Sequence, residues 1–384
     1  LGHAFAQRRL ADAERCLRRR LAAGAGHALR LKAAVMTEQD IRLRRLTGQY
    51  LSAPAPAHTV ARALCGFQAQ YPQNALHALS LRTDGEGPAQ ARLVKNWTLR
   101  GTIHLFSEED LPVYLGLTAG DRFRCNEWSA PSFWNQRPGW ALTPARQAYF
   151  TDVIVEALSR GPLTRDTLRE HCRARGMTED EAASMFDSWG GGLRELCERG
   201  FVCYPAGPEK ALRLCPPLEP LSAHAAQLTL ARRYFTHYAP ATIHDAMYFF
   251  HASAKAVRGW LAELPVHSAH CSGREYFWLD GEDAAPASPP ECRFLAGFDP
   301  LMLGYEKKES LFLPPERMRS VFSLAGQVAP VLLLHGRVCG IWRRKGASIH
   351  LTLWEALSPQ DADLVYAAAQ AAFPGCTLRE TPEL

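Results

Sequence analysis

Apolar residues recur at helical spacing in the segment that follows Met36. Between residues 37 and 51 they share one face of a helix, at Ile41, Leu43, Leu46 and Tyr50. Thr37 followed three residues later by Asp40 is typical of a capping box, so we predict that a helix begins there. Two further helices are predicted over residues 58–65 and 74–82.

The next apolar pattern alternates, over residues 97–106. A period of two is typical of a strand with one buried face. We therefore predict a single strand that buries Trp97, Leu99, Ile103 and Leu105. The opposite face then presents four hydrogen-bonding side chains, Thr98, Arg100, Thr102 and His104. From the pattern alone, these four lie either on a half-exposed strand or in a polar pocket.

One order of elements occurs twice further along the chain. Helices are predicted over 145–159, 165–175 and 178–199, followed by a hairpin from 201–205 and 211–215. Helices over 227–237, 243–250 and 254–264 precede a second hairpin, from 266–271 and 275–279. This order is that of a winged helix, so the fold class predicted is α+β with tandem winged-helix domains, three of them if 37–119 is another.

The predicted domain boundaries follow the breaks in these patterns. Residues 1–36 form a basic extension, either disordered or a lone helix, and we expect the native domain to begin near Met36. The three winged-helix domains are predicted over 37–119, 146–220 and 221–285, with a connector rich in Trp, Pro and Gly over 120–145. A β-rich domain over 291–376 contains a hairpin that turns at His335 and Gly336.

Composition narrows the class of protein. The chain has 384 residues, of which 47% are hydrophobic and 22% charged, as in a globular protein. Its longest aliphatic stretch, Val331 to Leu334, is far below the roughly 18 residues of a membrane span. The 11 cysteines include no C-x-x-C pair, which favours reduced thiols and a cytoplasmic location. We expect the protein to be bacterial and to associate with the nucleoid. The net charge of +5 is concentrated before Met36, so any affinity for nucleic acid must come from local patches.

Common enzyme signatures are absent from the sequence: there is no G-x-S-x-G, H-E-x-x-H, P-loop or G-x-G-x-x-G. His267, His270 and Cys271 cluster on a predicted wing without further partners, so we predict no metal site. No cofactor is predicted either.

A pair of glutamines stands in a segment that we expect to be extended. Gly66 ends a helix, and Pro72 keeps Tyr71 out of the helical region. On an extended backbone Gln68 and Gln70 share one face, whereas on a helix their amides would diverge. From the residues alone, a polar strand edge is the simpler interpretation.

Two motifs together, Gly66-Phe67-Gln68-Ala69-Gln70 and the segment 97–104, resemble the AlkZ/YcaQ family of winged-helix DNA glycosylases. The resemblance covers about residues 37–375 and includes the segments 296–305 and 334–344. It implies tandem winged helices around a concave surface that binds double-stranded DNA. It also implies that Gln68 and Gln70 are catalytic, in the branch of the family that has two glutamines.

The resemblance implies a monofunctional glycosylase that releases N7-alkylated purines and is able to unhook interstrand cross-links. The cellular role is either general repair or self-resistance to a DNA-damaging natural product. A cationic base is a good leaving group, so two neutral amides that position water would suffice. Contacts with DNA are expected from Arg100, His104, Thr98, Thr102, Arg343, Arg344 and Lys345. We expect a monomer.

The main alternative is a non-catalytic winged-helix regulator, since this fold more often reads DNA sequence than performs chemistry. Such a protein needs a recognition helix with base-reading side chains. The predicted helices at 180–187 and 254–264 are acidic or rich in apolar residues, which favours the enzyme. A third interpretation, a scaffold protein, predicts that lesions are bound without release of the base.

Overall fold

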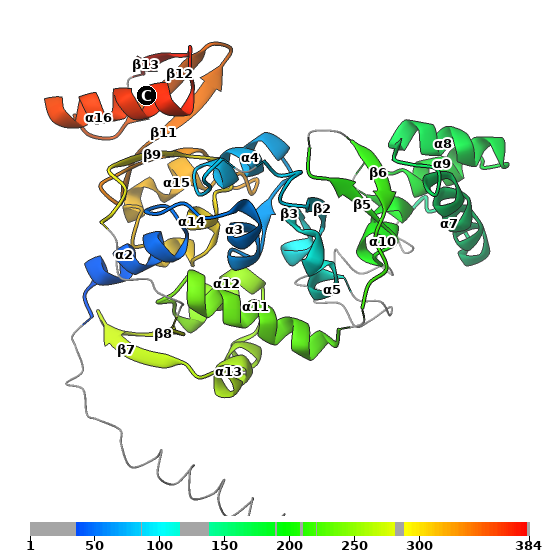
Figure 1. Ribbon diagram of the computed structural model, residues 1–384, viewed down its shortest axis with the longest axis horizontal. Coiled ribbons are helices and arrows are strands. Elements are labelled where there is room, and N and C mark those ends of the chain that lie inside the picture. Colours follow the sequence, from blue (N-terminus) through cyan, green and yellow to red (C-terminus); the bar gives the residue numbers. More distant parts are fainter. Residues whose placement is uncertain are drawn as a thin grey trace, which may run out of the picture. The chain divides into compact units, whose positions relative to one another are not determined.

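The computed structural model describes residues 36–85, 87–115, 138–188, 190–207, 210–219, 221–280 and 288–381. The predicted extension, except Met36, lies outside these residues, as do positions 120–137 of the predicted connector. Within the described part, helices and antiparallel strands mix as an α+β fold (Figure 1). The number and boundaries of winged-helix domains stay predictions.

The first segment begins with the predicted helix. Thr37 and Asp40 form the capping box, and the helix that follows buries Ile41 and Leu46. The elements of this segment are α2 (Glu38–Gly48), α3 (Ala57–Ala63), β1 (Phe67–Gln68), α4 (Pro72–Ser80), β2 (Leu93–Trp97), β3 (Ile103–Ser107) and α5 (Leu111–Tyr114).

The prediction of one strand over residues 97–106 is wrong. The chain turns back at a short 3₁₀ segment, Leu99–Gly101, so that β2 and β3 form an antiparallel hairpin. Arg100 (φ 58°) and Gly101 (φ 64°) both adopt the left-handed conformation, which glycine enters at little cost. Alternation continues through the turn because apolar residues on both sides of it pack inward, Leu99 and Leu105 in one core and Trp97 against a second core.

The second segment has the order of helices and hairpin that the sequence predicts. Its first three helices start at threonine caps, Thr143, Thr164 and Thr178, whose hydroxyl oxygens accept backbone N–H bonds. The elements are α7 (Pro144–Leu158), β4 (Leu163–Thr164), α8 (Arg165–Ala174), α9 (Glu179–Met185), α10 (Gly191–Glu198), β5 (Val202–Pro205) and β6 (Ala211–Leu214).

One sheet joins the first and second segments, in the order β1-β3-β2-β5-β6-β4. The junction is the pairing of β2 with β5, in which Val94 faces Pro205 and Lys95 faces Tyr204. The sequence patterns place β2 and β5 in separate domains. Local periodicity does not reveal that the two strands pair, because it contains no information about partners far apart in the chain.

The third segment repeats helices followed by a hairpin. Its elements are α11 (Ala223–His237), α12 (Ile243–Phe250), α13 (Ala254–Glu263), β7 (His267–Cys271) and β8 (Arg274–Trp278). In the predicted wing cluster, His267 Nε2 lies 2.8 Å from the Asp280 carboxylate at the surface. In the described residues, no group of three His, Cys, Asp or Glu side chains is arranged to hold a metal ion.

The C-terminal segment contains a five-stranded sheet, in the order β13-β12-β11-β10-β9, whose predicted hairpin at His335 and Gly336 is confirmed. Helix α16 packs against this sheet through a small core of its own (Figure 1). The elements are β9 (Cys292–Leu295), α14 (Pro300–Leu303), α15 (Met318–Val321), β10 (Val331–Leu334), β11 (Arg337–Lys345), β12 (Ser348–Leu353), α16 (Pro359–Ala372) and β13 (Thr377–Glu380).

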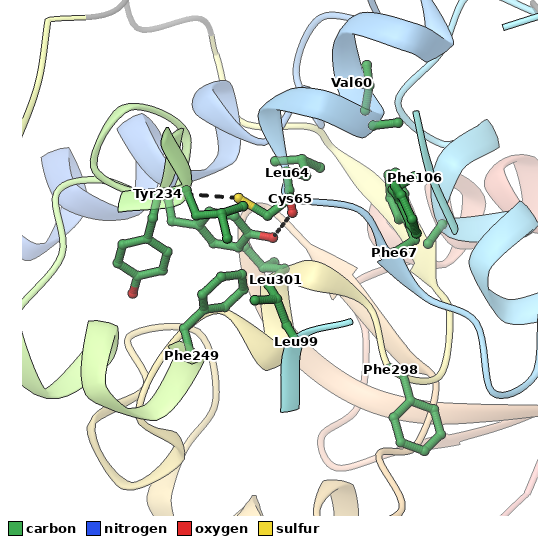
Figure 2. Packing of buried hydrophobic residues seen from close by; sticks show 14 of the residues in the cluster. Val60, Leu64, Cys65, Phe67, Leu99, Phe106, Tyr234, Phe249, Phe298 and Leu301 are labelled. Atoms are coloured by element: carbon green, nitrogen blue, oxygen red, sulfur yellow. Dashed lines mark hydrogen bonds between the residues drawn. The ribbon is translucent and has the colours of Figure 1, made fainter. Parts of the chain in front are cut away.

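The largest core combines side chains from the first, third and C-terminal segments (Figure 2). Two buried ion pairs cross it: Arg45 lies 2.9 Å from Asp245, and Arg82 lies 2.6 Å from Asp299. Arg82 also donates to the backbone oxygens of Gln49 and Ala78. Such additional bonds are needed because burying two charges otherwise costs more than their attraction returns. No helix of the described part is both long and apolar enough to cross a bilayer.

Candidate active site

Only the first part of the glutamine segment forms a strand, in which β1 pairs with β3; the chain bends at Gln70 and Tyr71, where the sequence predicts an extended backbone. Gln68 faces His104 in this ladder, and Ala69 N donates to Ile103 O at 2.7 Å. Gly66 (φ +79°) makes the preceding turn, and a Cβ on it would lie 3.0 Å from the Leu105 oxygen. Only glycine fits both the backbone angle and the space.

Alternate burial follows from this pairing. Phe67 and Ala69 are buried, whereas Gln68 is half-buried and Gln70 is exposed. In the described residues Gln70 has no hydrogen-bond partner, and its side chain stands at the surface just before Tyr71 and α4. The two amides are therefore in different surroundings, one facing protein and the other facing solvent.

Arg100 connects Gln68 to two other elements. From the turn of the β2–β3 hairpin, its Nη2 lies 3.4 Å from Gln68 Oε1 and 3.1 Å from His104 Nε2. Its Nη1 donates to Phe249 O at 3.0 Å, and its guanidinium lies 5.2 Å from the centre of the Phe249 ring. The arginine thus directs its donors at acceptors of the protein.

His104 is held neutral by its surroundings. Its Nδ1 donates to Thr102 O at 3.2 Å, which leaves Nε2 to accept from Arg100. Burial, and then the charge of Arg100, lower the pKa of His104 to about 3. The imidazole is thus an acceptor for Arg100 throughout the neutral range and does not exchange a proton there.

The segment at 296–305 approaches from the C-terminal part. Phe298 adopts a left-handed backbone conformation (φ 61°), and its ring stacks on Tyr71 with centroids 5.8 Å apart. Asp299 holds this turn, since its carboxylate accepts two bonds from buried Arg82 and one from Leu301 N. In Figure 2 the Phe298 ring lies apart from Leu64 and Phe67 of the core.

These segments meet around a small pocket. Its lining comes from several strands, helices and turns that are far apart in the chain: Cys65, Gly66, Gln68, Arg100, His104, Tyr238, Phe249, Phe298, Pro300 and Leu303. The volume open to the centre of a water molecule is about 10 Å³, roughly what a single water needs. The pocket therefore accommodates one water beside Gln68.

Titratable side chains of the lining keep one protonation state near neutral pH. Burial raises the pKa of Cys65 to about 12, and burial also raises the pKa of Tyr238 well above its ordinary value. The pKa of His104 is far below neutrality, and an arginine stays protonated in proteins. The pocket thus offers fixed charge and dipoles rather than a general base.

The remaining predicted site residues fall into two groups. Thr98 is buried, and its hydroxyl has no hydrogen-bond partner among the residues that the structure describes. Thr102 Oγ1 donates to Leu99 O at 3.3 Å. Burial of Thr98 and His104 favours a role in positioning over direct contact with DNA. Their predicted DNA contacts are otherwise untested.

Arg343, Arg344 and Lys345 are exposed at the end of β11 and do not line the pocket. Cross-strand pairing places Arg343 beside His350, which in turn pairs with Arg379 of β13. Desolvation, and then the charges of Lys345, Arg343 and Arg379, lower the pKa of His350. Arg343, Lys345 and Arg379 are the exposed cationic side chains on this face of the sheet, and we call them the β11 basic row.

Sequence reasoning missed several residues of the pocket. Phe298, Pro300 and Leu303 belong to a segment quoted for the family resemblance, but no role was assigned to it. Tyr238 directly follows α11 and Phe249 lies on α12, and the sequence predicts no functional role for either. Nothing in their local pattern marks them, because an aromatic residue at helical spacing indicates a core position.

Comparison with known proteins identifies the family of this chain. The sequence matches the family described as "DNA glycosylase AlkZ-like" over residues 61–373, and the chain belongs to that family. It is accordingly a hydrolase that acts on N-glycosyl bonds. The interstrand DNA cross-link repair glycosylase of Streptomyces sahachiroi is 28% identical over 324 residues, which are 78% of this chain and 85% of the relative.

A solved structure, the Streptomyces sahachiroi DNA glycosylase AlkZ, has a similar fold. It superimposes with a TM-score of 0.72 at 26% identity, covering 91% of this chain and all of the other. The structural similarity therefore covers most of the chain and extends well beyond the pocket.

Proposed function

We propose that this glycosylase hydrolyses the N-glycosidic bond of N7-alkylated purines in duplex DNA and unhooks interstrand cross-links formed through such bases. The name of the Streptomyces relative supports the cross-link as substrate. The observation that carries the proposal is the chemistry of the pocket, in which no lining group titrates close to neutral pH.

A pocket without a general base requires a substrate that is already activated. Alkylation at N7 leaves a positive charge on the purine, so the base departs with its bonding electrons and needs no protonation. The sugar then passes through an oxocarbenium-like state, as in glycoside hydrolysis. Positioned water and oriented dipoles are sufficient help for such a reaction, whereas an unmodified base would depart slowly.

Gln68 holds the attacking water in this mechanism. Its Oε1 has two lone pairs, of which one faces Arg100 Nη2 at 3.4 Å. The second lone pair accepts a hydrogen bond from the water, which turns the water's own lone pair toward the anomeric carbon. As the new C–O bond forms, the proton that the water loses passes to bulk solvent. Gln70, which is exposed and does not line the pocket, supplies the second amide once DNA covers the segment.

DNA would be held by groups outside the pocket. The β11 basic row, with Arg344 beside it, is exposed and suits phosphate oxygens. Arg100, His104, Thr98 and Thr102 support Gln68 from inside, with Arg100 closest to the bound sugar. We further propose that the described segments correspond to three winged helices on which one enzyme molecule holds the duplex. An open surface of this kind tolerates a bulky or cross-linked base better than a closed pocket does.

The experiment is base release from duplexes that contain N7-methylguanine or a nitrogen-mustard cross-link, measured as abasic sites under single turnover. Gln68→Ala and Gln70→Ala each remove one positioning amide, and we expect the rate to fall about 10²- to 10³-fold for Gln68→Ala. Both variants should bind the duplex nearly as well as the wild type. Gln39→Ala, which removes an exposed glutamine of α2, is the matched control. Unchanged release by the double variant would refute the assignment.

A further inference from the structure

An exposed aromatic ring stacks on a residue of the pocket lining. Tyr71 directly follows Gln70, and its side chain is 46% exposed. One face of its ring is stacked on Phe298, with an interplanar angle of 24°, while Phe298 itself is 8% exposed. The pair is therefore a two-layer stack in which the inner ring is covered by protein and the outer ring is open.

The inner ring is fixed in place at a cost. A bulky residue with positive φ is strained, and such strain persists only where neighbouring structure enforces it. Here Asp299, next to Phe298, is locked to buried Arg82 by two hydrogen bonds. A Cβ on the preceding Gly297 would lie 2.8 Å from Asn74 Nδ2. The turn is thus packed directly against α4.

The outer ring is anchored to the same helix. Tyr71 is the N-terminal cap residue of α4, and its backbone oxygen accepts from Asn74 N at 3.0 Å. The backbones that carry the two rings are therefore both held next to the first turn of α4. An aromatic surface that is ordered before binding loses little entropy when a partner stacks on it.

The stack of Tyr71 and Phe298 adjoins the pocket, because its inner ring is part of the pocket lining. Phe298 lines the pocket together with Gln68, so the open face of Tyr71 lies one ring away from that lining. Among the exposed large apolar side chains of the described residues, Tyr71 alone stacks on a residue of the pocket lining. An open aromatic face beside a site for a deoxyribose has the chemistry to receive a nucleobase.

We propose that Tyr71, supported by Phe298, is a stacking platform for a DNA base next to the lesion. The presence of a lesion beside that base rests on the proposed function, whereas the stacking itself requires only that DNA binds. Every base has a π face, so this contact holds DNA without selecting its sequence. A glycosylase that must act wherever damage occurs benefits from such a contact. Tyr71 is accordingly a positioning residue, since it orients the strand relative to Gln68.

The first test uses binding alone. Duplexes carry a tetrahydrofuran abasic analogue, which cannot be hydrolysed, with 2-aminopurine placed in turn at each of the neighbouring positions. Wild-type protein should change the fluorescence at one of these positions, because the probe leaves its own stack for the ring. Tyr71→Ala should abolish that change and weaken binding about tenfold, whereas Tyr71→Phe should keep both.

The second test is single-turnover release of N7-methylguanine by the same variants. Tyr71→Ala should slow release by about tenfold or more, and Tyr71→Phe should match the wild type. Tyr366→Ala, which removes a tyrosine of α16 that is 57% exposed, is the matched control for loss of a surface ring. Failure of wild-type release would count against the proposed function and leave the fluorescence result to decide the stacking.

The proposal is overturned if Tyr71→Ala gives the wild-type fluorescence at every position and binds within twofold of the wild type. It is also overturned if Tyr71→Phe is as impaired as Tyr71→Ala, because the hydroxyl group would then matter rather than the ring. Thermal unfolding of each variant establishes that the fold is retained, which is expected for a half-exposed side chain.

Discussion

The pocket around Gln68 and the β11 basic row differ in almost every physical respect. Pocket side chains are largely buried, bonded to protein and fixed in one protonation state. Arg343 and Lys345 are exposed on one face of β11. The contrast suggests a division of labour in which buried groups set the geometry of the reaction and exposed charges set affinity. Each prediction below tests one side of that division.

The largest effect on stability is expected at the ion pair beneath the pocket. Asp299→Ala leaves Arg82 charged and unpaired in the core, so the free energy of unfolding should fall by about 3–5 kcal/mol. Urea denaturation measures this loss. Glu179→Ala, which breaks an exposed pair with Arg173, is the control and should change stability little. Equal effects of the two variants would contradict the importance of burial.

The next effect concerns catalysis without affinity. Arg100→Met removes the donor that fixes Gln68 Oε1 and the β2–β3 turn, so the single-turnover rate at saturating DNA should fall about 10²-fold. The dissociation constant should change by less than threefold, because Arg100 directs its donors at protein acceptors. A large loss of affinity with an unchanged rate would instead assign Arg100 to phosphate binding, as the sequence first suggested.

The converse effect is expected at the exposed charges. Arg343→Met with Lys345→Met should weaken DNA binding while leaving the rate at saturation within about threefold of the wild type. Each lost phosphate contact should reduce the slope of log K against log salt by about 0.9. A titration over several salt concentrations measures this slope. An unchanged slope would remove these two residues from the DNA interface.

A smaller effect is expected at low pH. The folded-state pKa of His104 is about 3, below its ordinary value of 6.5, so the unfolded chain binds the additional proton first. Protonation of His104 therefore does not lower the free energy of unfolding above about pH 6.5. As pH falls from there toward 3, the unfolded chain takes up this proton and the folded state loses stability. His104→Gln should flatten that part of the stability profile, measured by urea denaturation at several pH values. His237, whose pKa is lowered to about 4 by burial, contributes in the same direction.

Local chemistry made much of the fold predictable. The capping box at Thr37, the hairpin at Gly273 and the turn at His335 each depend on a few neighbouring residues. The hairpin at Leu99–Gly101 was missed because alternation continues through a turn whose left-handed residues include an arginine. Gln68 was found through spacing and family resemblance. Phe249 and Phe298 were not, since they reach the pocket through tertiary packing that no local pattern encodes.

The most direct test of the central claim is the pH profile of single-turnover release of N7-methylguanine between pH 5.5 and 8.5. A pocket whose lining thiol has a pKa of about 12 and whose imidazole has a pKa of about 3 contains no group that changes charge in that interval. The rate at saturating DNA should therefore be flat, within about twofold. A bell-shaped profile, or a sigmoid with a midpoint near neutrality, would show that a titrating base drives the reaction and would contradict hydrolysis by neutral amides.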